Sequence, residues 1–142
     1  MISKHLTFYK HRKNQVKVFS INLIKRFTLF LKLTWSQGRK MTHYYKMAIL
    51  TSDKYKFDMY LLKFPTGSYI DNHRDPAPEG MEHHRINFVL NKNFKGGKFV
   101  IGGKAQEGRV HKFRPDKFTH KVTKVKEGTR YVFSIGYLRK AA

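Results

Sequence analysis

Two hydrophobic patterns divide the chain. In residues 16–33, apolar side chains recur every three or four positions, as on one face of an amphipathic helix. The side chains that form this stripe are Val16, Phe19, Leu23, Phe27, Phe30 and Leu31. The same stretch is rich in β-branched and aromatic residues, so a strand is the competing prediction. We expect residues 1–34 to form an N-terminal segment with an amphipathic helix in its second half.

From residue 44 onward, short apolar runs alternate with turn-forming residues. Seven runs have the length and composition of β-strands, and they cover residues 44–50, 57–64, 86–90, 98–101, 109–113, 121–125 and 130–138. Glycine and proline separate many of them, and the predicted turns include residues 65–67, 93–97 and 127–128. Short strands at this spacing are typical of a β-sandwich or barrel. Residues 35–142 should therefore form one mainly β domain.

The composition fits one folded domain without disulfides. The chain has 142 residues, 40% of them hydrophobic and 15% aromatic, so it can bury a core. It has no cysteine, which excludes disulfides and thiolate metal sites. That absence also fits a reducing cytoplasm, which would be the host cytoplasm if the protein is viral. No apolar run approaches the roughly 20 residues that a membrane span needs.

The formal charge is strongly positive and unevenly distributed. The net charge is +21, and no acidic residue precedes Asp53, so every charged side chain of the N-terminal segment is basic. A field of this sign attracts polyanions such as nucleic acid. Charge alone carries no specificity, so a contact with nucleic acid through the basic surface is an open expectation.

Four residues suggest metal chemistry. His73 and Asp75 are two positions apart, and in a strand such residues point to the same side. His120 begins a predicted strand far along the chain. Two imidazoles and one carboxylate can cover one face of a non-haem Fe(II) ion and leave the opposite face open. A cation beside such a centre, for which Arg130 is the candidate, can anchor the far carboxylate of a dicarboxylate co-substrate.

The surroundings of these residues strengthen the pattern, because His-x-Asp alone is a weak signal. Residues 35–138 resemble the double-stranded β-helix, or jelly roll, of the 2-oxoglutarate and Fe(II)-dependent oxygenases. Within that superfamily they are most similar to small prolyl-4-hydroxylase-like members of bacterial and phage type. The order and spacing of the similar segments agree, and these segments are residues 64–67, 73–75, 85–91, 96–99, 120–122 and 128–130.

The resemblance implies a ligand set and a reaction. His73, Asp75 and His120 would ligate Fe(II), and Arg130 would bind the 5-carboxylate of 2-oxoglutarate. With 2-oxoglutarate and O2 as co-substrates, and ascorbate as a possible reductant, the enzyme would hydroxylate a substrate and release succinate and CO2. The substrate is open between a protein, a nucleic acid and a small molecule.

Two departures narrow the choice of substrate. Residues 62–64 read Leu-Lys-Phe, where the nucleic-acid demethylase branch usually has Asn-x-Tyr. Animal-type prolyl hydroxylases usually carry lysine where this chain has Arg130. Neither nucleobase demethylation nor prolyl hydroxylation follows from the resemblance.

Three further residues are candidates for contact with 2-oxoglutarate or substrate. Arg85 and Asn87 lie two apart on a predicted central strand and should face the same side. The alternative is an edge hydrogen bond or an outward side chain for either residue. Tyr60 could donate its hydroxyl to the co-substrate, although a core tyrosine is the more common case.

The remaining histidines and the loop after Asp75 carry weaker expectations. Residues 76–84 follow the ligand pair and are predicted to form a loop that acts as a lid. His83 and His84 are adjacent and should face opposite sides, which suits solvent or substrate contact better than a metal pair. His111 lacks a partner pattern and is predicted to lie on the surface.

The sequence therefore predicts a mainly β jelly roll with a basic, helical N-terminal segment, acting as a 2-oxoglutarate-dependent dioxygenase. One alternative is a non-catalytic, basic nucleic-acid-binding β-protein. Another is a cupin-like metal protein with the same barrel and no 2-oxoglutarate. Arg130 distinguishes the oxygenase from the cupin-like metal protein, because a cupin-like site without 2-oxoglutarate has no need for it.

Overall fold

The computed structural model describes residues 34–142, and within them the chain is built from β-strands without a helix. The helix predicted over residues 16–33 lies outside the described residues. The strands are β1 (Ser36–Gln37), β2 (Tyr45–Ser52), β3 (Phe57–Phe64), β4 (Ile70–His73), β5 (Met81–Val89), β6 (Phe94–Gly96), β7 (Phe99–Ile101), β8 (Lys104–Ala105), β9 (Val110–Phe113), β10 (His120–Val122), β11 (Val125–Gly128) and β12 (Arg130–Lys140). Residues 34–142 therefore contain no helix with the length and hydropathy that would allow it to span a membrane.

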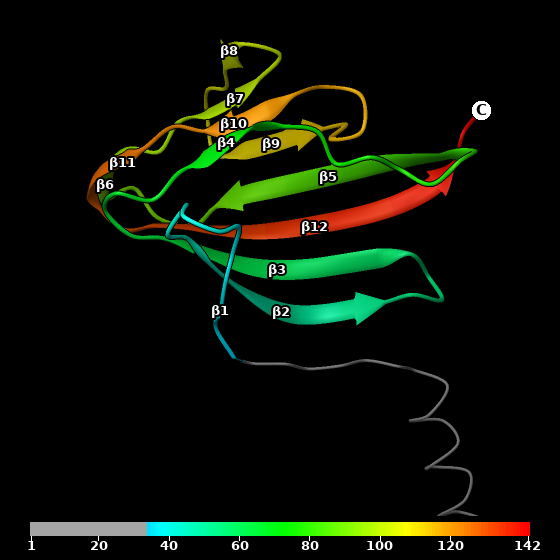
Figure 1. Cartoon of the computed structure of the whole chain (residues 1–142), viewed down its shortest axis with the longest axis horizontal. Helices are drawn as coiled ribbons and strands as arrows, with labels where there is room; N and C mark the ends of the chain where they lie inside the picture. The colour runs from blue at the N-terminus through cyan, green and yellow to red at the C-terminus, as the bar shows by residue number, and fades with distance from the viewer. Residues whose placement is uncertain (1–33) are drawn as a thin grey trace, which may run out of the picture.

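The strands form two facing sheets and a short connecting pair. The larger sheet has the order β1-β2-β3-β12-β5-β9, and the smaller has the order β4-β10-β7-β8. Figure 1 shows the two sheets as separate layers, with the β6–β11 pair at the end where they approach each other. The long strands β5 and β12 extend toward the opposite end (Figure 1). The arrangement is a jelly roll, so the predicted fold class is confirmed.

Alternation along the central strand β12 separates the inside of the roll from the outside. Arg130, Val132 and Ser134 are almost fully buried, whereas the residues between them are partly exposed. β12 pairs antiparallel with β3 on one side and with β5 on the other. Because side chains alternate between faces, this register directs one set of residues from all three strands toward the smaller sheet.

The hydrophobic core lies between the sheets near the β6–β11 end. Its buried residues are Tyr44, Phe64, Val89, Phe99, Phe113, Val122, Val125 and Val132. Apolar and aromatic side chains from both sheets interdigitate there, as expected for a sandwich core. The core thus occupies one end of the roll and leaves room for polar side chains farther along the same inner faces.

Several predicted boundaries were wrong, each because a long-range pairing decided it. Residues 93–97 were predicted to be a turn, yet Phe94–Gly96 forms β6 against β11. The single strand predicted over residues 121–125 divides into β10 and β11, which belong to different sheets. β4 was not predicted, and β5 begins at Met81, so the lid predicted over residues 76–84 is partly strand.

Candidate metal centre

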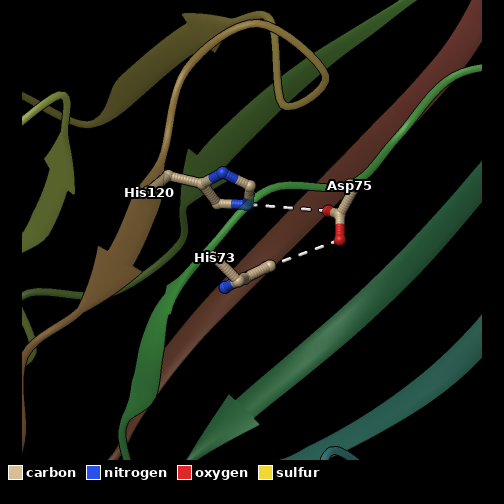
Figure 2. Close-up of side chains that lie close together, drawn as sticks. All are labelled: His73, Asp75 and His120. Carbon is tan, nitrogen blue, oxygen red and sulfur yellow. Dashed lines mark ion pairs between the residues drawn. The ribbon is translucent and has the colours of Figure 1, made fainter.

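Three potential ligands meet where β4 pairs with β10. His73 is the last residue of β4, His120 is the first residue of β10, and the two are direct partners in the antiparallel register. Asp75 follows two residues after His73, where its backbone N–H donates to the carbonyl of Pro115 (2.9 Å). One ligand atom from each of the three residues lies within 4.8 Å of the others. Figure 2 shows both imidazole rings turned toward the Asp75 carboxylate.

Backbone carbonyls orient both imidazoles. The Nδ1 of His73 lies 2.6 Å from the carbonyl oxygen of Asp71, and the Nδ1 of His120 lies 3.3 Å from that of Phe118. An Nδ1–H that donates to a carbonyl leaves Nε2 as the atom with the free lone pair. Both Nε2 atoms face Asp75, at 3.5 Å from its Oδ1 and Oδ2 respectively. The donor set is therefore two oriented imidazole nitrogens and a carboxylate, which suits a divalent transition metal.

The electrostatics keep the carboxylate ionised. Burial by itself would raise the pKa of Asp75, but the hydrogen bonds and charges of His120 and His73 outweigh it. The net effect holds the pKa of Asp75 far below its usual range. An ionised carboxylate beside imidazole nitrogens is the state that binds a cation.

The cluster of His73, Asp75 and His120 opens into a cavity between the two sheets. The cavity has a volume of about 290 Å³ and receives side chains from both the larger and the smaller sheet. All seven residues predicted to ligate the metal or to contact 2-oxoglutarate line it, and they are Tyr60, His73, Asp75, Arg85, Asn87, His120 and Arg130. The antiparallel registers of β12 with β3 and β5 bring Tyr60, Arg85, Asn87 and Arg130 onto one inner surface, which faces the ligand cluster on the smaller sheet.

Arg130 is a buried cation that faces this cavity, and no described residue provides it with a counter-ion. Its residue is 2% exposed, and among residues 34–142 its guanidinium makes no ion pair and no side-chain hydrogen bond. The ring of Phe64 lies 5.3 Å from the guanidinium carbon. Desolvation by burial lowers the pKa of Arg130 to about 10. Burying an unpaired charge is costly, and an anion bound in the cavity would offset that cost.

Arg85 and Asn87 both point into the cavity, and they belong to a polar network. Arg85 donates to both carboxylate oxygens of Asp58, at 2.8 and 3.0 Å, and to the hydroxyl of Ser134, at 2.8 Å. Ser134 donates in turn to the amide oxygen of Asn87 (2.7 Å). Gly136 is essential to this geometry, because a Cβ there would lie within 2.7 Å of the guanidinium carbon of Arg85. Arg85 is thus held by an ion pair, unlike Arg130.

Sequence reasoning missed Asp58 and Ser134 as members of this network. Asp58 lies two residues before Tyr60 on β3, so strand alternation was a signal that it shares the cavity face. Ser134 pairs with Tyr60 on one side and with Asn87 on the other, a placement that only the register shows. Tyr60 lines the cavity and is not a core residue, and burial raises the pKa of its hydroxyl.

The other histidines divide as strand alternation requires, with one correction. His83 lines the cavity, whereas His84 lies on the other side of β5, bonded to Glu82 (3.0 Å) and stacked on Tyr137. The prediction that His111 lies on the surface was wrong. His111 is 6% exposed on the inner side of β9, and neither ring nitrogen has a hydrogen-bond partner within residues 34–142.

Arg39 is a contact of the centre that the sequence did not suggest. Its Nη2 donates to the Oδ1 of Asp75 over 3.0 Å. Arg39 lies in the short segment between β1 and β2, and its side chain lines the cavity. Nothing in the local sequence pattern relates it to His-x-Asp 36 residues later.

Comparisons with known proteins agree on the architecture. No protein-family model matches the chain, and no curated protein matches it in sequence. A 2OG-Fe(II) oxygenase family oxidoreductase from Burkholderia pseudomallei is 14% identical, with a TM-score of 0.57 over 78% of this chain and 73% of that chain. A predicted oxalate decarboxylase from Thermotoga maritima is 16% identical, with a TM-score of 0.56 over 79% and 99% of the two chains.

A third similar structure is the cupin domain of Cnp3 from Schizosaccharomyces pombe. It is 6% identical, with a TM-score of 0.56 over 73% of this chain and 67% of that chain. Identities this low establish the fold alone, since one fold hosts many functions. The chain therefore has the jelly-roll fold of the cupins, with a cluster of His73, Asp75 and His120 that can hold a metal ion.

Proposed function

We propose that this chain is an Fe(II)- and 2-oxoglutarate-dependent dioxygenase that hydroxylates a substrate and releases succinate and CO2. One observation carries the proposal: a His-Asp-His cluster faces the same cavity as a buried arginine that has no ion-pair partner in the described part of the chain. The cluster accounts for a metal, and the arginine accounts for an acidic co-substrate. The two features together are more specific than either alone.

His73, Asp75 and His120 would hold the iron. They offer two imidazole nitrogens and one carboxylate oxygen within 4.8 Å of one another, and no fourth acidic or imidazole group from residues 34–142 joins the cluster. Three such ligands leave coordination positions for a co-substrate and for O2. The iron would supply the oxygen chemistry, while the protein positions the reactants and keeps water away.

Arg130 would bind the carboxylate of 2-oxoglutarate that lies farther from the metal. A guanidinium forms two parallel hydrogen bonds to a carboxylate, and in a buried site such a pair is strong. The cavity of about 290 Å³ suits a small dicarboxylate. The Asn87 amide and the Tyr60 hydroxyl line the same cavity and would contact 2-oxoglutarate or the substrate. Arg85 would orient Asn87 through Ser134.

A cupin-like metal protein without 2-oxoglutarate is the second candidate, because the similar structures include cupins with this fold. Such a protein would use the metal ligands and would need Arg130 only if its own substrate were an anion. The cost of burying Arg130 therefore supports a site for an anion, and the oxygenase supplies one in 2-oxoglutarate. The net charge of +21 supports a polyanionic substrate or partner such as nucleic acid, as a further part of the proposal.

The test is an anaerobic titration of the purified full chain with Fe(II) and then with 2-oxoglutarate. We expect the weak visible charge-transfer band of the iron–keto acid chelate in the unaltered protein. The band should be absent from His120→Ala and retained in His84→Ala, which removes an imidazole from the opposite face of the sheet. Iron binding without the band would favour the cupin-like protein. Failure to bind iron would refute both.

A further inference from the structure

Arg39 contacts the metal ligand Asp75 from a distant part of the chain. Its Nη2 donates to the Oδ1 of Asp75 over 3.0 Å. The Arg39 side chain is half exposed, so burial does not force its guanidinium to find an ionic partner. Surface ion pairs of this kind contribute little to stability. A role at the metal centre would explain why the chain brings this guanidinium to the ligand.

The segment that carries Arg39 is held in an unfavourable backbone conformation. Met41 and His43 have positive φ angles of 63° and 55°, which side chains of their kind rarely adopt. The hydroxyl of Thr42 donates a hydrogen bond to the carbonyl of Arg39 (2.7 Å), and the N–H of Tyr69 donates one to the carbonyl of Thr42 (3.1 Å). Strain that is held in place by specific bonds clusters at functional sites. The backbone of Arg39 is thereby fixed beside β4.

The two oxygens of Asp75 have different surroundings. Oδ1 accepts the hydrogen bond of Arg39 and lies 3.5 Å from the Nε2 of His73. Oδ2 lies 3.5 Å from the Nε2 of His120, and the hydrogen bond of Arg39 goes to Oδ1 and not to Oδ2. A carboxylate can bind a cation through one oxygen or through both. The guanidinium takes up a lone pair of Oδ1 and repels a second cation there.

We propose that Arg39 is a positioning residue that makes Asp75 a one-oxygen ligand. This inference rests on the metal site of the proposed function. With one donor atom each, His73, Asp75 and His120 leave three positions of an octahedral ion open. A chelating keto acid and O2 together need three positions. A two-oxygen Asp75 would take one of them, so Arg39 keeps the centre competent for both co-substrates.

The experiment uses Mn(II) alone, so it does not depend on 2-oxoglutarate. The full chain, Arg39→Ala, Arg39→Lys and Lys40→Ala are titrated with Mn(II), and two quantities are measured. One is the dissociation constant. The other is the enhancement of water proton relaxation for each bound ion, which reports how many positions exchangeable water occupies. Lys40→Ala is the matched control, because it removes the neighbouring positive charge without removing the contact to Asp75.

In Arg39→Ala we expect the relaxation enhancement per bound ion to fall by about one third, because water would occupy two positions instead of three. Mn(II) should bind about threefold to tenfold more tightly, since a nearby cation is removed and a ligand oxygen is gained. Arg39→Lys should restore both values, because lysine keeps a charged donor. Lys40→Ala should match the unaltered protein in relaxation.

If Arg39 only stabilises the segment between β1 and β2, a different result is expected. In that case Arg39→Ala would bind Mn(II) more weakly, with an unchanged relaxation per bound ion, and the inference would be overturned. If Mn(II) gives the expected results but the protein shows no chelate band with Fe(II) and 2-oxoglutarate, the proposed function is refuted and the inference about Arg39 is not. Thermal unfolding of each variant checks that the fold is intact.

Discussion

Replacing Arg130 with leucine should remove co-substrate binding and at the same time stabilise the empty protein. Leucine fills much of the same space without a charge, and Arg130 has no partner among the described residues that would be left unpaired. The sign of the stability effect follows from the pKa of Arg130, which burial lowers from its ordinary value to about 10. A lowered pKa means that the protonated form is disfavoured in the folded state, and at pH 7 this cost is present in full.

The magnitudes can be worked from these values. The depressed pKa of Arg130 corresponds to a cost of about 3 kcal/mol for keeping it charged in the fold. The variant should recover about 1–3 kcal/mol of that cost as a higher free energy of unfolding. Two charge-assisted hydrogen bonds to a carboxylate are together worth about 3–6 kcal/mol. Their loss should raise the dissociation constant for 2-oxoglutarate by about 10²- to 10⁴-fold.

The assay measures both quantities in the same preparations. Urea unfolding of the metal-free proteins gives the stability, and calorimetric titration of the Mn(II)-loaded proteins with 2-oxoglutarate gives the affinity. The affinity for Mn(II) itself should not change, because Arg130 is outside the ligand cluster. Two results would refute the reasoning: a variant that binds 2-oxoglutarate normally, or one that unfolds more easily by 2 kcal/mol or more. The second would make Arg130 a structural residue.

Two more predictions concern the framework around the cavity. Gly136→Ala should destabilise the fold by about 1–3 kcal/mol in urea unfolding, because the added Cβ collides with Arg85 and overpacks the inner face. The cost should shrink when Arg85 is also replaced with alanine, although the Cβ would still meet the Oδ1 of Asp58 at 2.8 Å, and an undiminished cost would show that the collision with Arg85 is not its cause. For Asp116, the hydrogen bond from Arg114 is the main cause that lowers the pKa of the carboxyl to about 2. A lowered carboxyl pKa stabilises the fold above the unfolded value near 4, and that contribution is lost as the pH falls toward 2. The stability lost in Asp116→Asn should therefore be greatest near pH 7 and shrink between pH 4 and pH 2, whereas a loss independent of pH would contradict this account.

The strands illustrate how far local patterns reach. β3 was predicted with the bounds it has, because the turn-forming residues 65–67 directly follow it and its own residues favour strands. β6 was missed because glycine and asparagine dominate residues 91–97, and only the pairing with β11 makes a strand of them. The division of residues 121–125 between two sheets had no local signal at all.

The candidate site shows the same division. His-x-Asp was visible because the two residues are neighbours on one side of the chain, and its order relative to His120 and Arg130 identified the resemblance. The misplacement of His111 had an equally clear origin. A histidine without a partner pattern usually lies at the surface, but the pairing of β9 with β5 turns this one inward.

By itself, the sequence determined the features that depend on neighbours along the chain. These are the mainly β character of residues 44–138, the alternation that directs Arg85 and Asn87 to one side, and the ligand pair His73 and Asp75. Periodicity of two and turn-forming residues act over a few positions, so they can be read without a fold.

Only the tertiary structure decided what those residues meet. It paired His120 with His73 across β4 and β10, held Arg85 with Asp58, left Arg130 without a described partner and brought Arg39 to Asp75. Each of these contacts depends on strand register and on how two sheets pack. Register is set by burial summed over whole strands, and a shift of one residue would exchange the two faces, so no local pattern can specify it.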